Sequence, residues 1–559
     1  MRKFIYSILI LTASLSAYAE KTPKSPYGIW AGRPGCDMPF VRGFWVACKW
    51  AELEPEKGKF NWNILEDQIK QAFKEGTSVG LMVFVGPDSP EWIYSNGVPK
   101  VFNSDAINTR GVSHLLKFPY YPYYLDPDYI NYWYKQIRTT GDWIASLPDS
   151  IRKNILLVQT AEGTTGDEGP YKGIPFDTNY RFSEKDQRWI DLKINAWRIY
   201  KEIYSNMNPP IQLLINSGNS QQYEGILDTL VPDVWKKSGH PGHIYQFNGE
   251  KTYYNSLKAQ LWKRNSTGEF RRFRSEMDET TNGWFRENHS QNMYWLNIFC
   301  LHYGLDILRM DCNLLQNPVY RPGFEFFSKY AGQKDPKEAI GAFSAMKDVL
   351  DASDKVRFPE NKYGKANSSN KDRFLAIVKD YEKFGARIGD LDHAVGGAMN
   401  NRTSSAINDV GYDLLEGNYE VFLKQLAPNE TSMGWWNIGP ADEPYGRFAR
   451  SFDYANRKNT MYFAINKDFF IKQSNKEVTI RIVYLDKGLG KWSLQYDSVD
   501  GNVKTASTVS NTNSGKWKEI KVDINDGRFT GNGPNGSDLI LNNESKEDSF
   551  FHMVELMKR

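Results

Sequence analysis

The chain has 559 residues, a formal net charge of +3, and 17 Trp and 32 Tyr among an aromatic content of 14%. A charge this close to neutral argues against a nucleic-acid-binding protein and leaves room for a neutral or an acidic substrate. The length predicts between two and four domains.

The first residues have the pattern of a secretory signal peptide. Met1-Arg2-Lys3 is basic, an apolar run follows from Phe4 to about Ala13, and Ala17-Tyr18-Ala19 fits an Ala-x-Ala cleavage site. We expect a signal peptide over 1–19 and export to the periplasm or the extracellular space. The apolar run is too short for a membrane span, and no later stretch is long enough for one.

Cysteine and histidine usage predicts no metal site. The four cysteines, Cys36, Cys48, Cys300 and Cys312, are too few for a disulfide scaffold in a chain this long, and their spacing fits no zinc motif. The seven histidines are scattered. We expect no transition metal and no cofactor. A bound calcium ion is an alternative that the sequence leaves open.

Short apolar segments alternate with helical patterns over the first 310 residues or so. The expected strands are 27–30, 41–48, 79–85, 155–162, 211–216, 243–247, 270–276 and 305–311. Three of the expected helices begin at an N-cap, namely Asn63, Asp126 or Ser183. This rhythm predicts a (β/α)₈ TIM barrel with a core at about 26–320, although the first two strands are too close for a helix between them.

The chain after the eighth strand is harder to assign. We expect a helix over 335–352 with Asp335 as N-cap, a polar linker over 365–372 and a helix over 373–384. These parts would complete the barrel's last helix and cover one rim. The catalytic domain would then extend over 26–435.

The end of the chain has the alternating pattern of antiparallel strands. Such strands are expected at 478–484, 491–496, 516–522 and 551–556, with a turn at 486–490. Alternation with turns at this spacing predicts an all-β sandwich at 440–559, which is a candidate carbohydrate-binding domain. Trp492 and Trp517 are its candidate sugar-stacking residues, and core packing is the alternative for both.

Two glutamates follow strands of the predicted barrel. Glu162 ends the fourth strand and Glu276 ends the seventh, where a TIM barrel places its catalytic groups. Glycoside hydrolysis needs two such carboxyl groups. Arg274 should point to the same side as Glu276 and hold it ionised, as a nucleophile requires. The alternatives are a solvated loop acid for Glu162, and for Glu276 a structural salt bridge with the basic run 271–274.

Several segments resemble those of clan A glycoside hydrolases, and most closely the β-galactosidases of family 42 and their relatives. The resemblance lies in Leu53-Glu54-Pro55 and Gly58-Lys59-Phe60-Asn61-Trp62 within the run from Trp50 to Trp62, and in Pro90-Glu91-Trp92-Ile93. It covers about 40–312. It implies that Glu162 is the acid/base, that Glu276 is the nucleophile and that anomeric configuration is retained.

One position departs from that family. Ala161 stands where the clan has an asparagine that binds the sugar 2-hydroxyl. The contact could come from Gln159, Asn216 or Asn248, or the substrate could be modified at that hydroxyl. Asp167 and Glu168 remain rivals to Glu162, as Asp278 and Glu279 do to Glu276.

The residues expected to bind substrate are aromatic or amide side chains near strand ends. The chosen set is Trp50, Trp92, Gln159, Asn216, Tyr245 and Trp284, with Trp45, Trp435, Trp436, His240 and His243 as further candidates.

Together these features predict a secreted retaining glycoside hydrolase acting on a poly- or oligosaccharide. A β-galactosidic plant or algal polymer is preferred on the resemblance, and a sulfated polymer stays open. The alternative is a non-catalytic glycan-binding protein on a decayed barrel, which Ala161 and the crowded acids favour.

Overall fold

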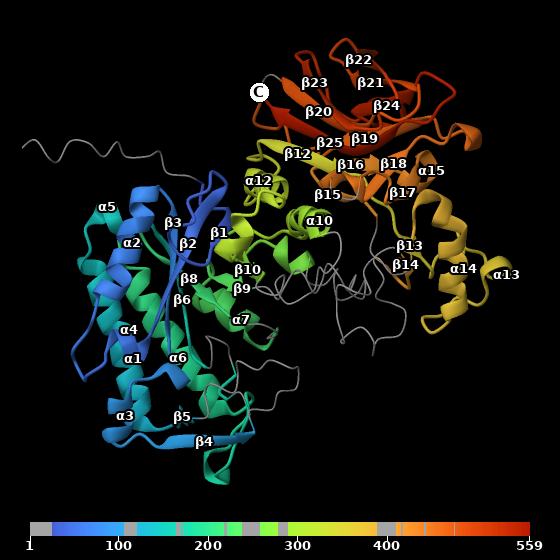
Figure 1. The fold of residues 1–559 in the computed structure, drawn as a ribbon. Helices are drawn as coiled ribbons and strands as arrows, with labels where there is room; N and C mark the ends of the chain where they lie inside the picture. The colour runs from blue at the N-terminus through green and yellow to red at the C-terminus, as the bar shows by residue number, and fades with distance from the viewer. Residues whose placement is uncertain are drawn as a thin grey trace, which may run out of the picture. The chain divides into compact units, whose positions relative to one another are not determined.

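The computed structural model describes residues 25–105, 120–163, 169–171, 173–216, 221–237, 258–277, 289–387, 410–414, 417–440, 443–473 and 476–559. The chain divides into two compact units (Figure 1): Trp30–Val234 belongs to the first, and Tyr27–Ile29 with Trp235–Arg559 to the second. The predicted signal peptide lies outside the described residues.

Eight strands close into a parallel barrel, which confirms the predicted fold class. Around the barrel the order is β1-β11-β10-β9-β8-β6-β3-β2. The strands are β1 (Gly28–Ala31), β2 (Val41–Lys49), β3 (Ser78–Phe84), β6 (Ile155–Gln159), β8 (Gln212–Ile215), β9 (Trp235–Lys237), β10 (Phe273–Met277) and β11 (Ile307–Met310). As expected, no helix lies between β1 and β2.

The sixth barrel strand is not where the sequence pattern placed it. The expected strand at 243–247 lies outside the described residues, and β9 (Trp235–Lys237) takes the sixth place in the barrel. Two of its three residues are lysines. A strand this short and this charged gives no apolar run, which is why the sequence pattern missed it.

Helices of the first unit follow their barrel strands. They are α1 (Trp50–Leu53), α2 (Asn63–Glu75), α3 (Glu91–Ser95), α4 (Pro127–Ser146), α5 (Asp149–Arg152), α6 (Gln187–Tyr204) and α7 (Gln221–Leu230), with 3₁₀ turns η1 (Gly86–Asp88) and η4 (Thr178–Tyr180). A small antiparallel sheet, β5-β4-β7, comprises β4 (Lys100–Asp105), β5 (Tyr120–Pro122) and β7 (Ile174–Pro175).

One of the three N-caps predicted within the barrel is confirmed. Asp126 accepts hydrogen bonds from the first turn of α4. Asn63 is instead the first residue of α2, after Trp62. Ser183 lies outside α6, because Asp186 accepts the Arg188 N–H and caps that helix.

Two glycines make room for indole rings on the barrel strands. A Cβ at Gly43 would overlap the ring of Trp30, and one at Gly80 would overlap the ring of Trp45. Trp45 pairs in register with Gly80, so the large residue on β2 faces the small one on β3. This pairing of a large with a small residue fills the space without a cavity.

In the second unit, helices follow the barrel strands, and antiparallel sheets follow later in the chain. The helices are α10 (His289–Tyr303), α11 (Cys312–Leu315), α12 (Arg321–Tyr330), α13 (Glu360–Tyr363), α14 (Lys371–Tyr381) and α15 (Pro428–Thr431), with 3₁₀ turns η6 (Glu382–Phe384), η8 (Pro444–Gly446), η9 (Tyr454–Asn456) and η10 (Pro534–Gly536). The expected helix over 373–384 corresponds to α14 and η6.

Two antiparallel sheets form a sandwich-like region. One has seven strands: β12 (Gly341–Ala345), β15 (Tyr419–Val421), β17 (Met433–Trp436), β18 (Phe448–Ser451), β20 (Val478–Leu485), β23 (Trp517–Ile524) and β25 (Phe550–Lys558). The other has five: β16 (Leu423–Leu426), β19 (Thr460–Ile465), β21 (Lys491–Asp497), β22 (Val503–Ser510) and β24 (Leu539–Asn543). Side chains from both sheets share one buried core.

The predicted helix over 335–352 is wrong. Gly341–Ala345 is strand β12, paired with β25 and β15, and β13 (Leu350–Asp351) pairs with β14 (Val410–Gly411). All five residues of β12 are buried. Partners distant in the sequence stabilise this strand, so the sheets begin well before the expected boundary at 440.

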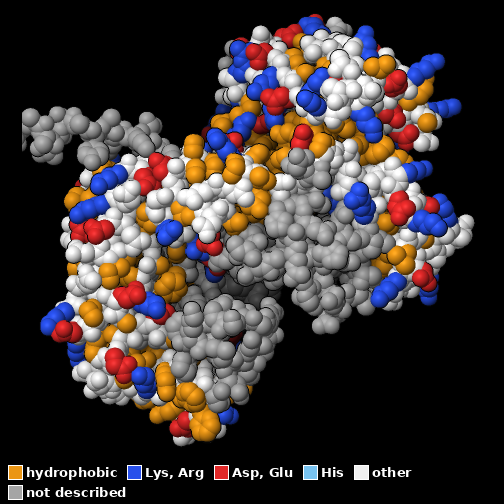
Figure 2. All heavy atoms as spheres, in the orientation of Figure 1, with side chains coloured by type: hydrophobic (Ala, Val, Ile, Leu, Met, Phe, Trp, Pro, Cys, Tyr) orange, Lys and Arg blue, Asp and Glu red, His pale blue; other side chains and the backbone are white. Residues whose placement is uncertain are grey.

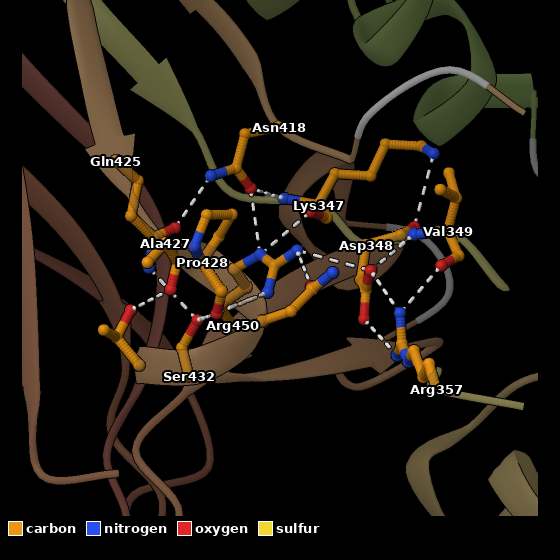
Figure 3. Close-up of polar contacts among 12 residues, drawn as sticks. Lys347, Asp348, Val349, Arg357, Asn418, Gln425, Ala427, Pro428, Ser432 and Arg450 are labelled. Carbon is orange, nitrogen blue, oxygen red and sulfur yellow. Dashed lines mark hydrogen bonds and ion pairs between the residues drawn. The ribbon is translucent and has the colours of Figure 1, made fainter. Parts of the chain in front are cut away.

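A buried polar cluster fixes the start of this region (Figure 3). Asp348 accepts hydrogen bonds from both terminal nitrogens of Arg357, at 3.2 and 2.7 Å, and lies 3.3 Å from Arg450 Nη2. Arg450 Nε also donates to the Asn418 side chain and the Lys347 carbonyl, each at 3.0 Å. The cluster therefore links the segment after β12 to β18 through charged side chains.

The described cysteines fall into two kinds. Cys36 and Cys312 are disulfide-bonded. Cys48 and Cys300 are free and buried. Among the described helices, none has both the length and the apolar character to cross a membrane.

Candidate active site

Four charged side chains share one face of three neighbouring barrel strands. Arg274 of β10 pairs in register with Lys237 of β9, and Glu276 pairs with Arg309 of β11. Arg274 and Glu276 are two residues apart, so both project to the same side of the strand. The register therefore brings three cations to one carboxylate, and we name these four residues the Glu276 cluster.

Both oxygens of Glu276 are occupied by cations. Lys237 Nζ lies 2.5 Å from Oε1, and Arg274 Nη2 donates to Oε2 at 2.9 Å. Arg309 Nη1 is farther away, 3.8 Å from Oε2, and its Nη2 lies 3.9 Å from Asp311 Oδ1. The Arg274 contact that the sequence predicted is present, whereas the Lys237 contact was not predicted because β9 was not recognised as a strand.

The environment of Glu276 keeps it ionised. Burial by itself would raise its pKa, but Arg274, Lys237 and Arg309 outweigh burial and bring the pKa far below the ordinary range. An ionised carboxylate at the end of a barrel strand has the protonation state of a nucleophile or of a base.

Glu162 is in a different environment, in the first unit. It follows β6 by three residues, and its side chain is 1% exposed. The indole N–H of Trp197, on α6, donates to its Oε1 at 2.6 Å. Burial raises the pKa of Glu162, with the Trp197 bond and the charge of Lys193 opposing it in part. A raised pKa suits a proton donor.

On the face drawn in Figure 2, positive and negative side chains are interspersed and no broad patch has one sign. Around Glu276, two of the cations, Lys237 and Arg274, lie within hydrogen-bond distance of the carboxylate.

Two of the three tryptophans expected to bind substrate, Trp50 and Trp92, have structural contacts. Trp50 is fully buried and its indole N–H donates to Glu54 Oε2 at 2.8 Å. Trp92 is half-buried and donates to the Glu54 carbonyl at 3.0 Å. The rings pack edge to face at 6.1 Å. Trp50 has no face left for a sugar, so its burial does not agree with the substrate-binding prediction.

The two amides expected near the sugar are also buried. Gln159 is 2% exposed, and its Oε1 accepts no hydrogen bond in the described structure. Asn216 follows β8 and is 8% exposed. A buried acceptor without a partner costs free energy, and Gln159 Oε1 is one of several such buried polar atoms in the described part of the first unit.

Exposed aromatic side chains occur on the small sheet that follows β3 and β6. Phe102, Tyr120 and Phe176 are all substantially exposed, and the rings of Phe102 and Tyr120 lie 5.4 Å apart. Sequence reasoning missed them because it searched for tryptophans at strand ends. Phe102 and Phe176 are the only aromatic residues of their segments, 100–105 and 174–176, and only Tyr120 lies in an aromatic-rich run, 120–124, that could have marked it.

The remaining candidates divide between described and undescribed residues. Tyr245, Trp284, Asn248, His240, His243, Asp167, Glu168, Asp278 and Glu279 lie outside the described residues. Trp45 and Trp436 are buried, and Trp435 is half-buried with its N–H donating to Ser451. Among the described side chains, no three His, Cys, Asp or Glu group as a metal site.

Comparison with known proteins gives structural neighbours only. No family model and no curated protein matches the chain. The similar solved structures include xylanase 10B from Thermotoga maritima (12% identity, 54% of this chain and 95% of that chain, TM-score 0.33) and a β-galactosidase from the psychrophilic Marinomonas ef1 (8%, 54% and 59%, 0.35). A third is GH5_18 from Bifidobacterium longum subsp. longum (10%, 55% and 80%, 0.36). At this level of similarity, the fold is assigned from the strand topology. The activity has to be inferred from the residues of the site.

Proposed function

We propose that the protein is a glycoside hydrolase that cleaves O-glycosidic bonds with retention of configuration. The observation that carries this proposal is Glu276, an ionised carboxylate near the carboxyl end of a barrel strand, with its charge stabilised by Arg274 and Lys237. TIM barrels position catalytic groups at this end of their strands.

The proposed reaction has two displacements. An oxygen of Glu276 attacks the anomeric carbon, the bond to the leaving oxygen breaks, and Glu162 gives its proton to that oxygen. Water then attacks the anomeric carbon, giving a proton to Glu162 while the bond to Glu276 breaks. Glu276 is again a carboxylate and Glu162 again carries a proton.

The raised pKa of Glu162 supports its role as the acid, whereas the burial of its side chain argues against that role. In the described conformation the carboxyl group meets Trp197 of α6 and is 1% exposed. Catalysis by Glu162 therefore requires its side chain to leave Trp197. Asp167 and Glu168 are the competing acids.

The substrate in this proposal is a polysaccharide with β-galactosidic bonds, on the sequence resemblance to family 42. Export follows from the pattern of residues 1–19. The second candidate function is a non-catalytic glycan-binding protein, which the burial of Glu162 and the occupied oxygens of Glu276 favour.

Product release tests the proposal. Wild type, Glu276→Gln and the exposed control Glu325→Gln would be incubated with galactans, agars, carrageenans and fucans. We expect release by wild type and the control and none by Glu276→Gln. If neither wild type nor Glu276→Gln releases sugar but both are retarded in gels cast with one polymer, the protein is a glycan-binding protein.

Azide rescue assigns the acid. Alanine variants of Glu162 and Glu168 would be assayed with an activated aryl glycoside in the presence of azide. Azide restores turnover in a variant that lacks the acid/base, and the product is a glycosyl azide of retained configuration. Rescue of Glu168→Ala but not of Glu162→Ala would overturn the assignment of Glu162.

A further inference from the structure

The small sheet β5-β4-β7 has one face that is apolar and exposed to solvent. Its strands lie in the connections that follow the barrel strands β3 and β6. These connections leave the carboxyl ends of the strands, where TIM barrels bind their substrates. Glu162 lies at the start of the second connection, so the sheet belongs to the same side of the barrel as this glutamate.

The two faces of this sheet differ in burial. Val101, Asn103 and Tyr121 are buried. Phe102 and Tyr120 alternate with them along the strands, so they project to the opposite face, where they are 45% and 47% exposed. An antiparallel sheet with one covered face normally has polar side chains on the other. Here the outer face has aromatic side chains instead.

Three aromatic side chains form a row across the outer face. Phe102 pairs in register with Tyr120, and their rings lie 5.4 Å apart. On the other side of β4, Asn103 faces Pro175, which places Phe176 opposite Phe102. Residues directly opposite one another project to the same face, and we name Tyr120, Phe102 and Phe176 the aromatic row. Figure 2 shows hydrophobic side chains gathered over this sheet at the lower edge of the view.

The end of the row is held by hydrogen bonds. The backbone N–H of Phe176 donates to the Phe102 carbonyl at 2.8 Å. Arg181 donates to the carbonyls of Pro175, at 2.8 Å, and Phe176, at 3.3 Å. Phe176 is nevertheless 70% exposed. A ligand that binds a side chain on a fixed backbone costs less conformational entropy than one that must order a loop.

The size of the exposed surface argues against a second protein as its ligand. Together with the exposed Ile174, the aromatic row presents roughly 400 Å² of apolar surface, if each side chain offers about 150–250 Å² when fully exposed. A stable protein–protein interface needs about 800 Å² on each partner. Apolar patches of the smaller size on monomers often have a function.

The charges next to the aromatic row argue against a membrane surface or a nucleic acid. Lys100 lies over the Tyr120 ring at 5.2 Å, but its Nζ donates to both oxygens of Glu91 at 2.9 Å. The residue that follows Phe176 is the exposed Asp177. Anionic surfaces attract unmatched basic side chains, whereas this lysine is matched and its neighbourhood includes an acid.

We propose that the aromatic row is a platform that binds the chain of a polysaccharide through the faces of its sugar rings. One face of a sugar ring carries C–H groups, and the π face of an aromatic ring attracts such hydrogens. Neighbouring strands are about 4.8 Å apart, so the row extends over about 10 Å and contacts consecutive sugars. This inference rests on the proposed function for its carbohydrate ligand, but not on the catalytic roles of Glu162 and Glu276.

Affinity electrophoresis in gels cast with galactan, agar, carrageenan or fucan measures the binding. Every protein in these gels carries Glu276→Gln, so that no polymer is cleaved during the run. Combining Phe102→Ala with Phe176→Ala should raise the Kd for at least one polymer by about tenfold or more, since each stacked ring contributes severalfold. Ile226→Ala removes an exposed apolar side chain from α7 of the same unit and should leave retardation unchanged.

Two single substitutions separate ring stacking from a loss of fold. Phe176 is exposed, so its variants should melt at the same temperature as the wild type. Phe176→Tyr keeps a flat ring and should retain the affinity. Phe176→Leu keeps an apolar side chain without a ring and should weaken binding by about threefold or more. Equal affinities of these two variants would overturn stacking on this ring.

The outcomes distinguish this inference from the proposed hydrolase. If the protein with intact Glu276 releases product and the double variant is retarded like its parent, the platform is overturned and the hydrolase stands. If no product is released but retardation is lost in the double variant, the platform stands and the hydrolase is overturned. Absence of retardation by all four polymers overturns the platform. Sedimentation that shows a dimer for the wild type and a monomer for the double variant assigns this face to a second copy and overturns it as well.

Discussion

Substituting Asp348 by asparagine should destabilise the second unit by about 2–3 kcal/mol at neutral pH. Asp348 is 2% exposed and its neighbours Arg357 and Arg450 lower its pKa from 3.8 to about 2, even though burial would raise it. A lowered folded-state pKa means that the ionised form stabilises the fold. A shift of about two units corresponds to about 2–3 kcal/mol.

The sign of the effect fixes its pH dependence. The stabilisation is present above the unfolded-state pKa, near 4, and is lost as the pH falls through about 2, where the folded Asp348 is protonated. The difference between wild type and Asp348→Asn should therefore shrink to under about 1 kcal/mol at pH 2. Alanine should cost more, about 3–5 kcal/mol, because it leaves the buried Arg450 without its charge partner.

Thermal unfolding and amide hydrogen exchange measure the effect. At pH 7 the melting temperature of the second unit should fall by about 3–5 °C in Asp348→Asn, and exchange should increase in peptides covering β12 and β18. Asp372→Asn, an exposed aspartate on α14, is the control and should change stability by less than about 1 kcal/mol. An unchanged melting temperature, or an equal deficit at pH 2 and pH 7, would refute the argument.

Three further predictions concern packing. Gly80→Val should lower barrel stability by about 1–3 kcal/mol because its Cβ overlaps the Trp45 ring, whereas Gly225→Ala, with open space around it, should not. Thermal melts compare the two, and equal losses would contradict the clash. Trp492→Ala should cost about 3–5 kcal/mol since that ring is fully buried against Phe551, and chemical denaturation with no measurable loss would contradict its core role. The free thiols should resist iodoacetamide at pH 8 in the folded protein and react once it is unfolded, because burial raises the pKa of Cys48 to about 12 and that of Cys300 well above its ordinary value. Rapid labelling of the native protein would count against that burial.

How much of the site the sequence could predict differs between the two glutamates. Glu276 and Arg274 are two residues apart on one strand, so their contact follows from strand geometry alone. Lys237 is 39 positions away on a strand of three residues, and only the pairing of β9 with β10 brings it to Glu276. The bond from Trp197 to Glu162 likewise depends on how α6 packs against the barrel, which the pattern of neither α6 nor β6 specifies.

The sequence by itself determined the barrel and its type. Buried strands such as β6 appear as apolar runs, and Asp126 with Pro127 marks a helix start, because both signals depend on neighbouring residues in the chain. Only the tertiary structure decided that Gly341–Ala345 is a strand rather than part of a helix, and that Trp50 and Trp492 are core rather than sugar platforms. Those outcomes depend on partners outside the local segment, whose burial and pairing outweigh local preference.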